Sequence, residues 1–269
     1  MLLSQQLKSY ITRRMIIKPV NCFQDNYAYI LLDESSKKAA AVDPVEPDNI
    51  LKALSEYPDY TLSMILTTHH HHDHAGGNTS FLKKLEPEKI KCYGGSEKVN
   101  GVNHIVKDNE TIQLGSLSIR AITTPCHTMD HICYYVENND DDRAVFTGDC
   151  LFSSGCGRFF EGSAKEMWEA LSKLAALPDN TKVYFGHEYT LSNLKFAESV
   201  EPHNKDIQEK KKWAQQVKCT TPSTIGNEKL TNPFIRCDLP EVFKHIVHHP
   251  EKAKQVDILG QLRRMKDDF

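Results

Sequence analysis

The sequence Thr68-His69-His70-His71-His72-Asp73-His74 lies where a short apolar run gives way to a helical pattern. Residues 63–67 predict a buried strand before the histidine stretch. Residues 78–85 predict a helix after the stretch, with Asn78 or Thr79 as its N-cap. Imidazole and carboxylate groups on such a loop can converge in front of a sheet, and both bind zinc and iron. A terminal tag or a solvated histidine tract lacks the preceding strand and the following Asp-His pair. The stretch therefore predicts a metal site.

Spacing along this loop divides its side chains into two groups. His69 and His71 are two residues apart in an extended segment, so both can aim at one ion. Asp73 and His74 can aim at a neighbouring ion. The histidines between them alternate to the opposite side, because four adjacent histidines cannot all bind.

Length, charge and cysteine usage limit the class of protein. A chain of 269 residues can form one or two domains with a sizeable core. Its 33 basic and 36 acidic residues give a formal charge of -3, which argues against general nucleic-acid binding. The eight cysteines form no Cys-x-x-Cys pair and are typical of reduced thiols in a reducing compartment. No apolar stretch approaches the length of a membrane span, so no membrane partner is expected.

The first fourteen residues have the composition of a mitochondrial transit peptide. They contain Lys8, Arg13 and Arg14, no acidic residue, and apolar residues on one helical face. We therefore expect the mitochondrial matrix as the location of the mature chain. An ordinary basic arm is the alternative, and Met15 could serve as a second start that gives a cytoplasmic form.

Apolar patterning predicts two blocks of strands followed by a helical region. We expect strands at residues 16–20, 27–32, 39–42, 63–67, 90–93, 105–106, 117–122, 132–136, 144–146 and 183–185. We expect helices at residues 47–57, 78–85, 163–177, 191–200, 204–216, 239–247 and 251–266, with no strand after residue 189. Ser163-x-x-Glu166 is a capping box that opens one of these helices. The pattern indicates two facing mixed sheets between helical layers, then a helical second domain joined without a flexible linker.

Three further ligand-type residues follow expected strands. His127 lies on a turn after residue 122, Asp149 follows Gly148, and His187 follows Gly186. One such residue alone is more often part of the core. Together with the histidine stretch, however, the chain has four strand ends that carry ligand-type residues, which is much less likely to occur by chance. The set divides into His69, His71 and His127 on one ion, Asp73, His74 and His187 on the other, and Asp149 as a bridge.

This series of motifs resembles the metallo-β-lactamase superfamily and, within it, the hydroxyacylglutathione hydrolases, or glyoxalase II. The matching segments are residues 25–27, 68–78, 124–128, 146–149, 155–162, 186–190, 232–234 and 262–267. The resemblance implies an αββα sandwich at residues 15–187 and an all-helical glutathione-binding domain at residues 188–269. It also implies hydrolysis of S-D-lactoylglutathione to glutathione and D-lactate, a reaction of methylglyoxal detoxification.

A thioester hydrolase of this kind needs no serine or cysteine nucleophile. Two divalent ions, zinc first with iron or manganese as alternatives, can hold a bridging hydroxide and polarise the carbonyl oxygen. Asp73 would bind one ion and orient that hydroxide by accepting a hydrogen bond. A thiolate leaves without a strong proton donor, because thiol pKa values lie near about 8.5.

The resemblance also implies which side chains hold glutathione. They are Arg158, Phe160, Tyr189, Arg263 and Lys266. The family often has Lys-x-Tyr where this chain has Arg158-Phe159-Phe160, so the charge is kept but one hydroxyl is missing. On charge pattern alone, a solvated helix end rich in basic residues is the alternative for Arg263 and Lys266.

The same motifs leave other functions open. A mononuclear-iron persulfide dioxygenase of the same superfamily and a non-catalytic metal-binding protein are the alternatives, and a nuclease would need a more basic surface. The full ligand set and the basic residues of the last helix favour the hydrolase. We expect a monomer that binds a small glutathione thioester and neither nucleic acid nor membrane.

Overall fold

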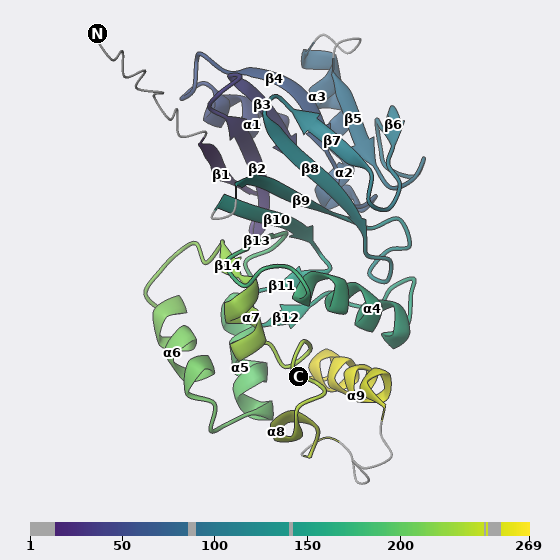
Figure 1. The fold of residues 1–269 in the computed structure, drawn as a ribbon, viewed down its shortest axis with the longest axis vertical. Helices are drawn as coiled ribbons and strands as arrows, with labels where there is room; N and C mark the ends of the chain where they lie inside the picture. Colours follow the sequence, from purple (N-terminus) through teal and green to yellow (C-terminus); the bar gives the residue numbers. More distant parts are fainter. Residues whose placement is uncertain (1–13, 86–89, 140–141, 245, 247–253) are drawn as a thin grey trace, which may run out of the picture.

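Two stacked sheets lie above a group of helices in the computed structural model (Figure 1), which describes residues 14–85, 90–139, 142–244, 246 and 254–269. Residues 1–13 of the expected transit peptide lie outside the described residues, as do residues 247 and 251–253 at the ends of two expected helices. No helix within the described ranges is both long and apolar enough to cross a membrane.

The first sheet keeps its strands in sequence order. They are β1 (Met15–Cys22), β2 (Asn26–Asp33), β3 (Lys38–Val42), β4 (Thr61–Leu66), β5 (Lys91–Gly94) and β6 (His104–Ile105). The first three strands pair antiparallel, and β3 to β6 pair parallel. All six correspond to expected strands, shifted by a few residues at their ends.

The second sheet has the order β14-β13-β10-β9-β8-β7. Its strands are β7 (Thr111–Leu114), β8 (Leu117–Thr123), β9 (Ile132–Asn139), β10 (Asp142–Gly148), β13 (Lys182–Phe185) and β14 (Ser223–Thr224), and a hairpin of β11 (Leu151–Phe152) and β12 (Gly155–Cys156) lies beside it. Four of these strands were not expected, namely β7, β14 and the two short strands of the hairpin, β11 and β12. β7 pairs with β8 across a two-residue turn, and β14 pairs with β13 although it follows residue 189, where no strand was predicted.

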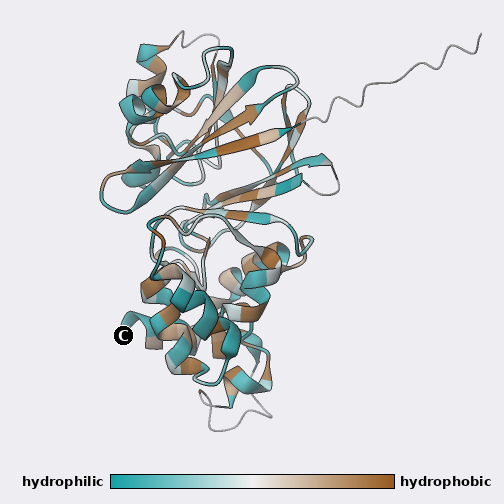
Figure 2. Cartoon of the chain, turned by 90° about the vertical axis from the view of Figure 1, so that its left-hand side faces the viewer, coloured by the Kyte–Doolittle hydropathy of each residue, from teal (hydrophilic) through white to brown (hydrophobic). Residues whose placement is uncertain are grey.

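Alternation along β2 explains the layers. Tyr27, Tyr29 and Leu31 pack in the core between the two sheets, whereas Ala28, Ile30 and Leu32 pack in a separate core with Ile50 and Phe81. Those last two residues belong to α1 (Pro47–Leu54) and α3 (Asn78–Lys84), which cover the first sheet. On the other side α4 (Ala164–Ala175) buries Met167, Leu171 and Leu174, which belong to the same buried cluster as the strands of the second sheet. The expected αββα sandwich is confirmed, and Figure 2 shows hydrophobic stretches along its strands and alternating hydrophobic and hydrophilic residues on the helices below.

The remaining helices follow the sandwich in the sequence. They are α5 (Thr190–Val200), α6 (Lys205–Ala214), α7 (Ile225–Thr231), α8 (Pro240–Phe243) and α9 (Gln255–Asp267). α7 was not expected, because Gly226 weakens its helical pattern. The helix expected from residue 239 ends at Phe243, and the one expected from residue 47 ends at Leu54. The capping box of Ser163 and Glu166 at the start of α4 is confirmed.

The helix after the histidine stretch begins differently from the prediction. A one-turn helix that was not expected, α2 (His72–Ala75), comes first, and Gly77 rather than Asn78 or Thr79 is the N-cap of α3. A Cβ at Gly77 would lie 2.1 Å from the Pro44 carbonyl oxygen, so the close approach of the two segments requires glycine. Asn78 is buried and donates to the Thr67 hydroxyl instead.

Candidate active site

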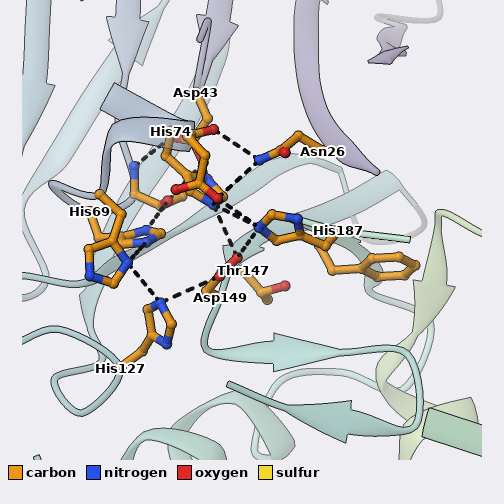
Figure 3. Close-up of polar contacts among 12 residues, drawn as sticks. Asn26, Asp43, His69, His74, His127, Thr147, Asp149 and His187 are labelled. Carbon is orange, nitrogen blue, oxygen red and sulfur yellow. Dashed lines mark hydrogen bonds and ion pairs between the residues drawn. The ribbon is translucent and has the colours of Figure 1, made fainter. Parts of the chain in front are cut away.

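Three histidines at two strand ends form one compact group. His69 Nε2 lies 3.2 Å from His71 Nδ1, which lies 3.1 Å from His127 Nε2 (Figure 3). Nitrogens on a tetrahedral ion with bonds of about 2.0–2.1 Å stand roughly 3.3–3.4 Å apart. The three-histidine cluster, as we call this group, therefore has the spacing of metal ligands.

A second group lies beside the first. His74 Nε2 is 3.2 Å from His187 Nε2, which is 3.4 Å from Asp73 Oδ2. We call Asp73, His74 and His187 the aspartate-containing cluster. α2 carries the first two of these residues, and His187 follows β13. The one-turn helix thus brings Asp73 and His74 toward the end of β13, while the ring centroid of His74 stays 4.3 Å from that of His69.

Asp149 lies between the two clusters. Its Oδ1 is 3.2 Å from His74 Nε2 and 3.4 Å from His187 Nε2, and its Oδ2 is 3.4 Å from His127 Nε2. Oδ1 is buried, and within the described part of the chain it has no hydrogen-bond partner. A buried carboxylate oxygen without a donor, surrounded by imidazole nitrogens, fits a bound cation. The seven residues expected as ligands thus meet in one place.

Burial and charge act differently on the two clusters. Burial lowers the pKa of His127 to about 4 and that of His69 well below its usual value, so these imidazoles are neutral. Burial alone would also lower the pKa of His74, but Asp149 and Asp43 raise it to about 10. At His187, burial would likewise lower the pKa, but the charge of Asp149 outweighs it and the pKa rises to about 12. Neutral imidazoles suit metal binding, and the carboxylates at the aspartate-containing cluster favour positive charge of any kind there.

Residues behind the ligands hold them in place, and the sequence did not assign these roles. Asp43 at the end of β3 accepts from the Thr68 amide at 2.8 Å and lies 2.9 Å from His74 Nδ1. Asp25 Oδ1 lies 2.9 Å from His187 Nδ1, and the Asp149 amide lies 3.3 Å from His131 Nε2. The available signal for Asp43 was its place before Pro44 at a strand end.

The two remaining histidines of the stretch turn away from both clusters. His70 Nδ1 lies 2.8 Å from Asp130 Oδ1, and His72 is exposed at the start of α2. This agrees with the alternation expected from the sequence.

A cavity of about 740 Å³ opens onto the clusters and reaches the last helix. Its lining includes Arg158, Phe160, Tyr189, Arg263 and Lys266, the five residues expected to contact glutathione. Phe160 is 60% exposed, and its ring centroid lies 5.1 Å from that of His127 and 5.7 Å from that of His71. One cavity therefore joins the ligand clusters to the basic residues of α9.

The basic residues of this cavity differ in how far their charged groups already make contacts within the protein. Lys266 Nζ lies 3.2 Å from both the carbonyl and the hydroxyl oxygen of Ser192, and burial lowers its pKa. Arg263 is only 7% exposed and donates to the Cys156 carbonyl at 2.8 Å and to Asp267 at 3.0 Å. Most of the Arg263 guanidinium is therefore used within the protein, whereas the Arg158 side chain is 63% exposed and pairs with Asp267 at 3.4 Å.

Comparison with known proteins agrees with this geometry. Residues 25–187 match the family model of the metallo-beta-lactamase superfamily, and residues 188–269 match that of the hydroxyacylglutathione hydrolase C-terminus. A protein of Arabidopsis thaliana named hydroxyacylglutathione hydrolase cytoplasmic is 46% identical over 95% of this chain and 99% of its own length. The hydroxyacylglutathione hydrolase of Dictyostelium discoideum is 40% identical over 95% of this chain and 100% of its own.

Among solved structures, ETHE1 from Myxococcus xanthus has a TM-score of 0.63 and 26% identity over 94% of this chain and 98% of that one. The fold and its paired clusters define a protein of the metallo-β-lactamase superfamily. Within that superfamily the chain belongs to the hydroxyacylglutathione hydrolase family. The family resemblance seen in the sequence is confirmed.

Proposed function

We propose that this chain hydrolyses glutathione thioesters, with S-D-lactoylglutathione as substrate and glutathione and D-lactate as products. One observation carries the proposal: a single cavity joins two potential metal-ligand clusters to Arg158, Tyr189 and Lys266. Relatives that are 40–46% identical over nearly the whole chain and are named hydroxyacylglutathione hydrolase support the same activity.

The metal part of the proposal assigns two divalent ions to the site. The three-histidine cluster would hold one, the aspartate-containing cluster the other, and Asp149 would lie between them. Zinc is our first choice, because it is the common partner of nitrogen ligands at tetrahedral spacing. Two such ions supply a nucleophile at neutral pH and polarise the thioester carbonyl.

The remaining work falls to the side chains of the cavity. Arg158 and Lys266 offer positive charge to the glutathione carboxylates, and Tyr189 offers a hydroxyl. Arg263 supports this wall through its bonds to Cys156 and Asp267. Phe160 supplies an apolar face beside His127 where a tyrosine would add one more hydrogen bond. Binding in this way brings the thioester carbon toward the clusters.

Asp73 would orient the attacking water. Its side chain is 43% exposed, it lines the cavity, and interaction with His187 lowers the pKa of its carboxyl, so it remains an acceptor. Attack forms a carbon–oxygen bond and breaks the carbon–sulfur bond. The electron pair of that bond leaves with the glutathione sulfur as a thiolate, which needs little protonation.

The test is hydrolysis of S-D-lactoylglutathione by purified protein of known metal content. We expect one thiol released for each thioester lost, without oxygen uptake, and little hydrolysis of a small thioester that lacks the tripeptide. Oxygen consumption with a persulfide would favour the dioxygenase. Absence of both reactions in a metal-loaded, folded protein would favour a non-catalytic metal-binding role.

We further propose that residues 1–14 direct the chain to the mitochondrial matrix. Their acid-free, basic composition supports this location, although the Arabidopsis relative is named cytoplasmic. Fusion of these residues to a neutral reporter should send the reporter to mitochondria. A diffuse signal would favour the cytoplasmic form that a start at Met15 would give.

A further inference from the structure

The two clusters differ in what stands behind their histidines. In the three-histidine cluster, His69 Nδ1 lies 3.0 Å from the Thr68 hydroxyl oxygen, and His127 Nδ1 lies 3.0 Å from the Arg158 carbonyl oxygen. Both partners are uncharged. His69 and His127 are therefore in direct contact with neutral groups, and the Thr68 hydroxyl in turn donates to Asp43.

Carboxylates take the same positions in the aspartate-containing cluster. His74 Nδ1 lies 2.9 Å from Asp43 Oδ2, and His187 Nδ1 lies 2.9 Å from Asp25 Oδ1. A carboxylate behind an imidazole fixes its tautomer and makes its other nitrogen a stronger donor to a metal. Both histidines of this cluster have that support, and Asp73 adds a third carboxylate as a direct ligand.

Burial keeps water from screening the carboxylate behind His74. Asp43 and His74 are 3% and 1% exposed, so water screens their interaction poorly. The Asp25 side chain is 43% exposed and contributes less. Asp149 contacts both clusters and cannot distinguish them. Asp25 and Asp73 thus lie beside the aspartate-containing cluster. Asp43 contacts His74 of that cluster directly and reaches His69 of the other only through the Thr68 hydroxyl.

We propose that the two metal positions are unequal, and that Asp25 and Asp43 make the aspartate-containing cluster the first to bind a divalent ion. The inference rests on the proposed two-metal centre and adds an order of filling and two positioning residues. At low metal supply the chain then holds one ion among Asp73, His74 and His187, and the three-histidine cluster fills second.

The experiment measures two stepwise Zn²⁺ binding constants for the metal-stripped full chain, by competition with a chromophoric chelator at pH 7. Asp25→Asn removes a charge behind His187 and keeps an oxygen acceptor, so it should weaken the first constant by about 10-fold. His71→Ala removes a ligand of the three-histidine cluster, so it should weaken the second constant and leave the first unchanged. Asp43→Asn is less suitable, because Asp43 also accepts from the Thr68 amide and hydroxyl.

Glu110→Gln is the control. Glu110 lies 3.1 Å from His104, and neither residue belongs to either cluster, so the same kind of change in a histidine–carboxylate pair should alter neither constant. Circular dichroism confirms that each variant is folded. Equal constants in the unmodified chain, or a first constant that falls in His71→Ala but not in Asp25→Asn, would overturn the order. Saturation at one ion would instead contradict the two-metal centre itself.

Discussion

The rings of His187 and Tyr189 are parallel to within 3°, with their centroids 4.8 Å apart. Glu188 between them is fixed from two sides, because its carboxylate accepts from the Tyr27 hydroxyl at 2.6 Å and from the Thr220 amide at 2.9 Å. A proposed metal ligand and a proposed glutathione contact are thus held as one unit by β2 and by the segment before β14.

Two substitutions of Tyr189 distinguish the contribution of its hydroxyl to substrate binding from that of its stacked ring. Tyr189→Phe keeps the stack and should raise KM for the glutathione thioester by about 3- to 10-fold, since one hydrogen bond contributes about 1 kcal/mol. Turnover should change little. Tyr189→Ala removes the ring as well and should raise KM further. Steady-state kinetics at equal metal content tests both, and an unchanged KM in Tyr189→Ala would remove this residue from the substrate site.

Lys266 should contribute to binding rather than to turnover. Its charge-assisted contact is half-buried, so Lys266→Ala should raise KM by about 10-fold and change kcat less. Arg264→Ala is the control, because Arg264 is exposed on the same helix and does not line the cavity. Equal effects of the two substitutions would mean that the end of α9 acts only through its overall charge.

Asp149→Ala should weaken both metal positions together. The two oxygens of this carboxylate face different clusters, so its loss removes a ligand from each. Substitution of residues that only hydrogen-bond to metal ligands already costs about 10–100-fold in affinity or activity, so loss of Asp149 should lower activity by at least about 100-fold. Metal analysis after dialysis checks this, and two retained ions would show that Asp149 is not shared.

Asp33 should make stability depend on acid pH. Burial alone would raise its pKa, but hydrogen bonds from Ser116, Ser36 and Ser35 lower it below the usual 3.8. A lowered folded-state pKa gives stability that is present above pH 3.8 and is lost as the pH falls through the folded-state value. Asp33→Asn should therefore cost about 1–3 kcal/mol at pH 7 and less at pH 3. Urea unfolding of both metal-free proteins at the two pH values measures this difference, which a pH-independent loss would contradict.

The ion pair between α6 and α7 should be sensitive to loss of one partner. Lys210 Nζ lies 2.7 Å from Glu228 Oε1, and both side chains are buried. Lys210→Met leaves a buried carboxylate without its counter-charge and should cost about 3–5 kcal/mol. Lys211→Met breaks the more exposed pair with Glu198 and should cost at most about 1 kcal/mol. Similar unfolding free energies for the two variants would show that burial does not control this pair.

The sequence predicted what local pattern controls. Apolar runs placed most strands, and the residues directly after them gave all seven proposed ligands. β7 was missed even though Ile112 and Leu114 alternate before Gly115-Ser116, a turn in which Gly115 has φ +60°. That hairpin signal was present but short.

Other features depend on contacts between distant segments. β14 has only two residues, and pairing with β13 rather than propensity makes it a strand. The roles of Asp25 and Asp43 require knowing which histidine each meets. Arg263 looks like an exposed helix-end cation in the sequence, yet packing against Phe234 and Cys156 buries it.

β14 also has a consequence for how the chain can be divided. It covers the outer side of β13, the strand that leads to His187. A chain cut after His187 would keep every proposed metal ligand but leave the backbone N–H and C=O groups of β13 open to pairing with another molecule. Such a fragment would tend to self-associate and aggregate. The helical region therefore protects the edge of the second sheet from pairing with other molecules, in addition to forming a wall of the cavity.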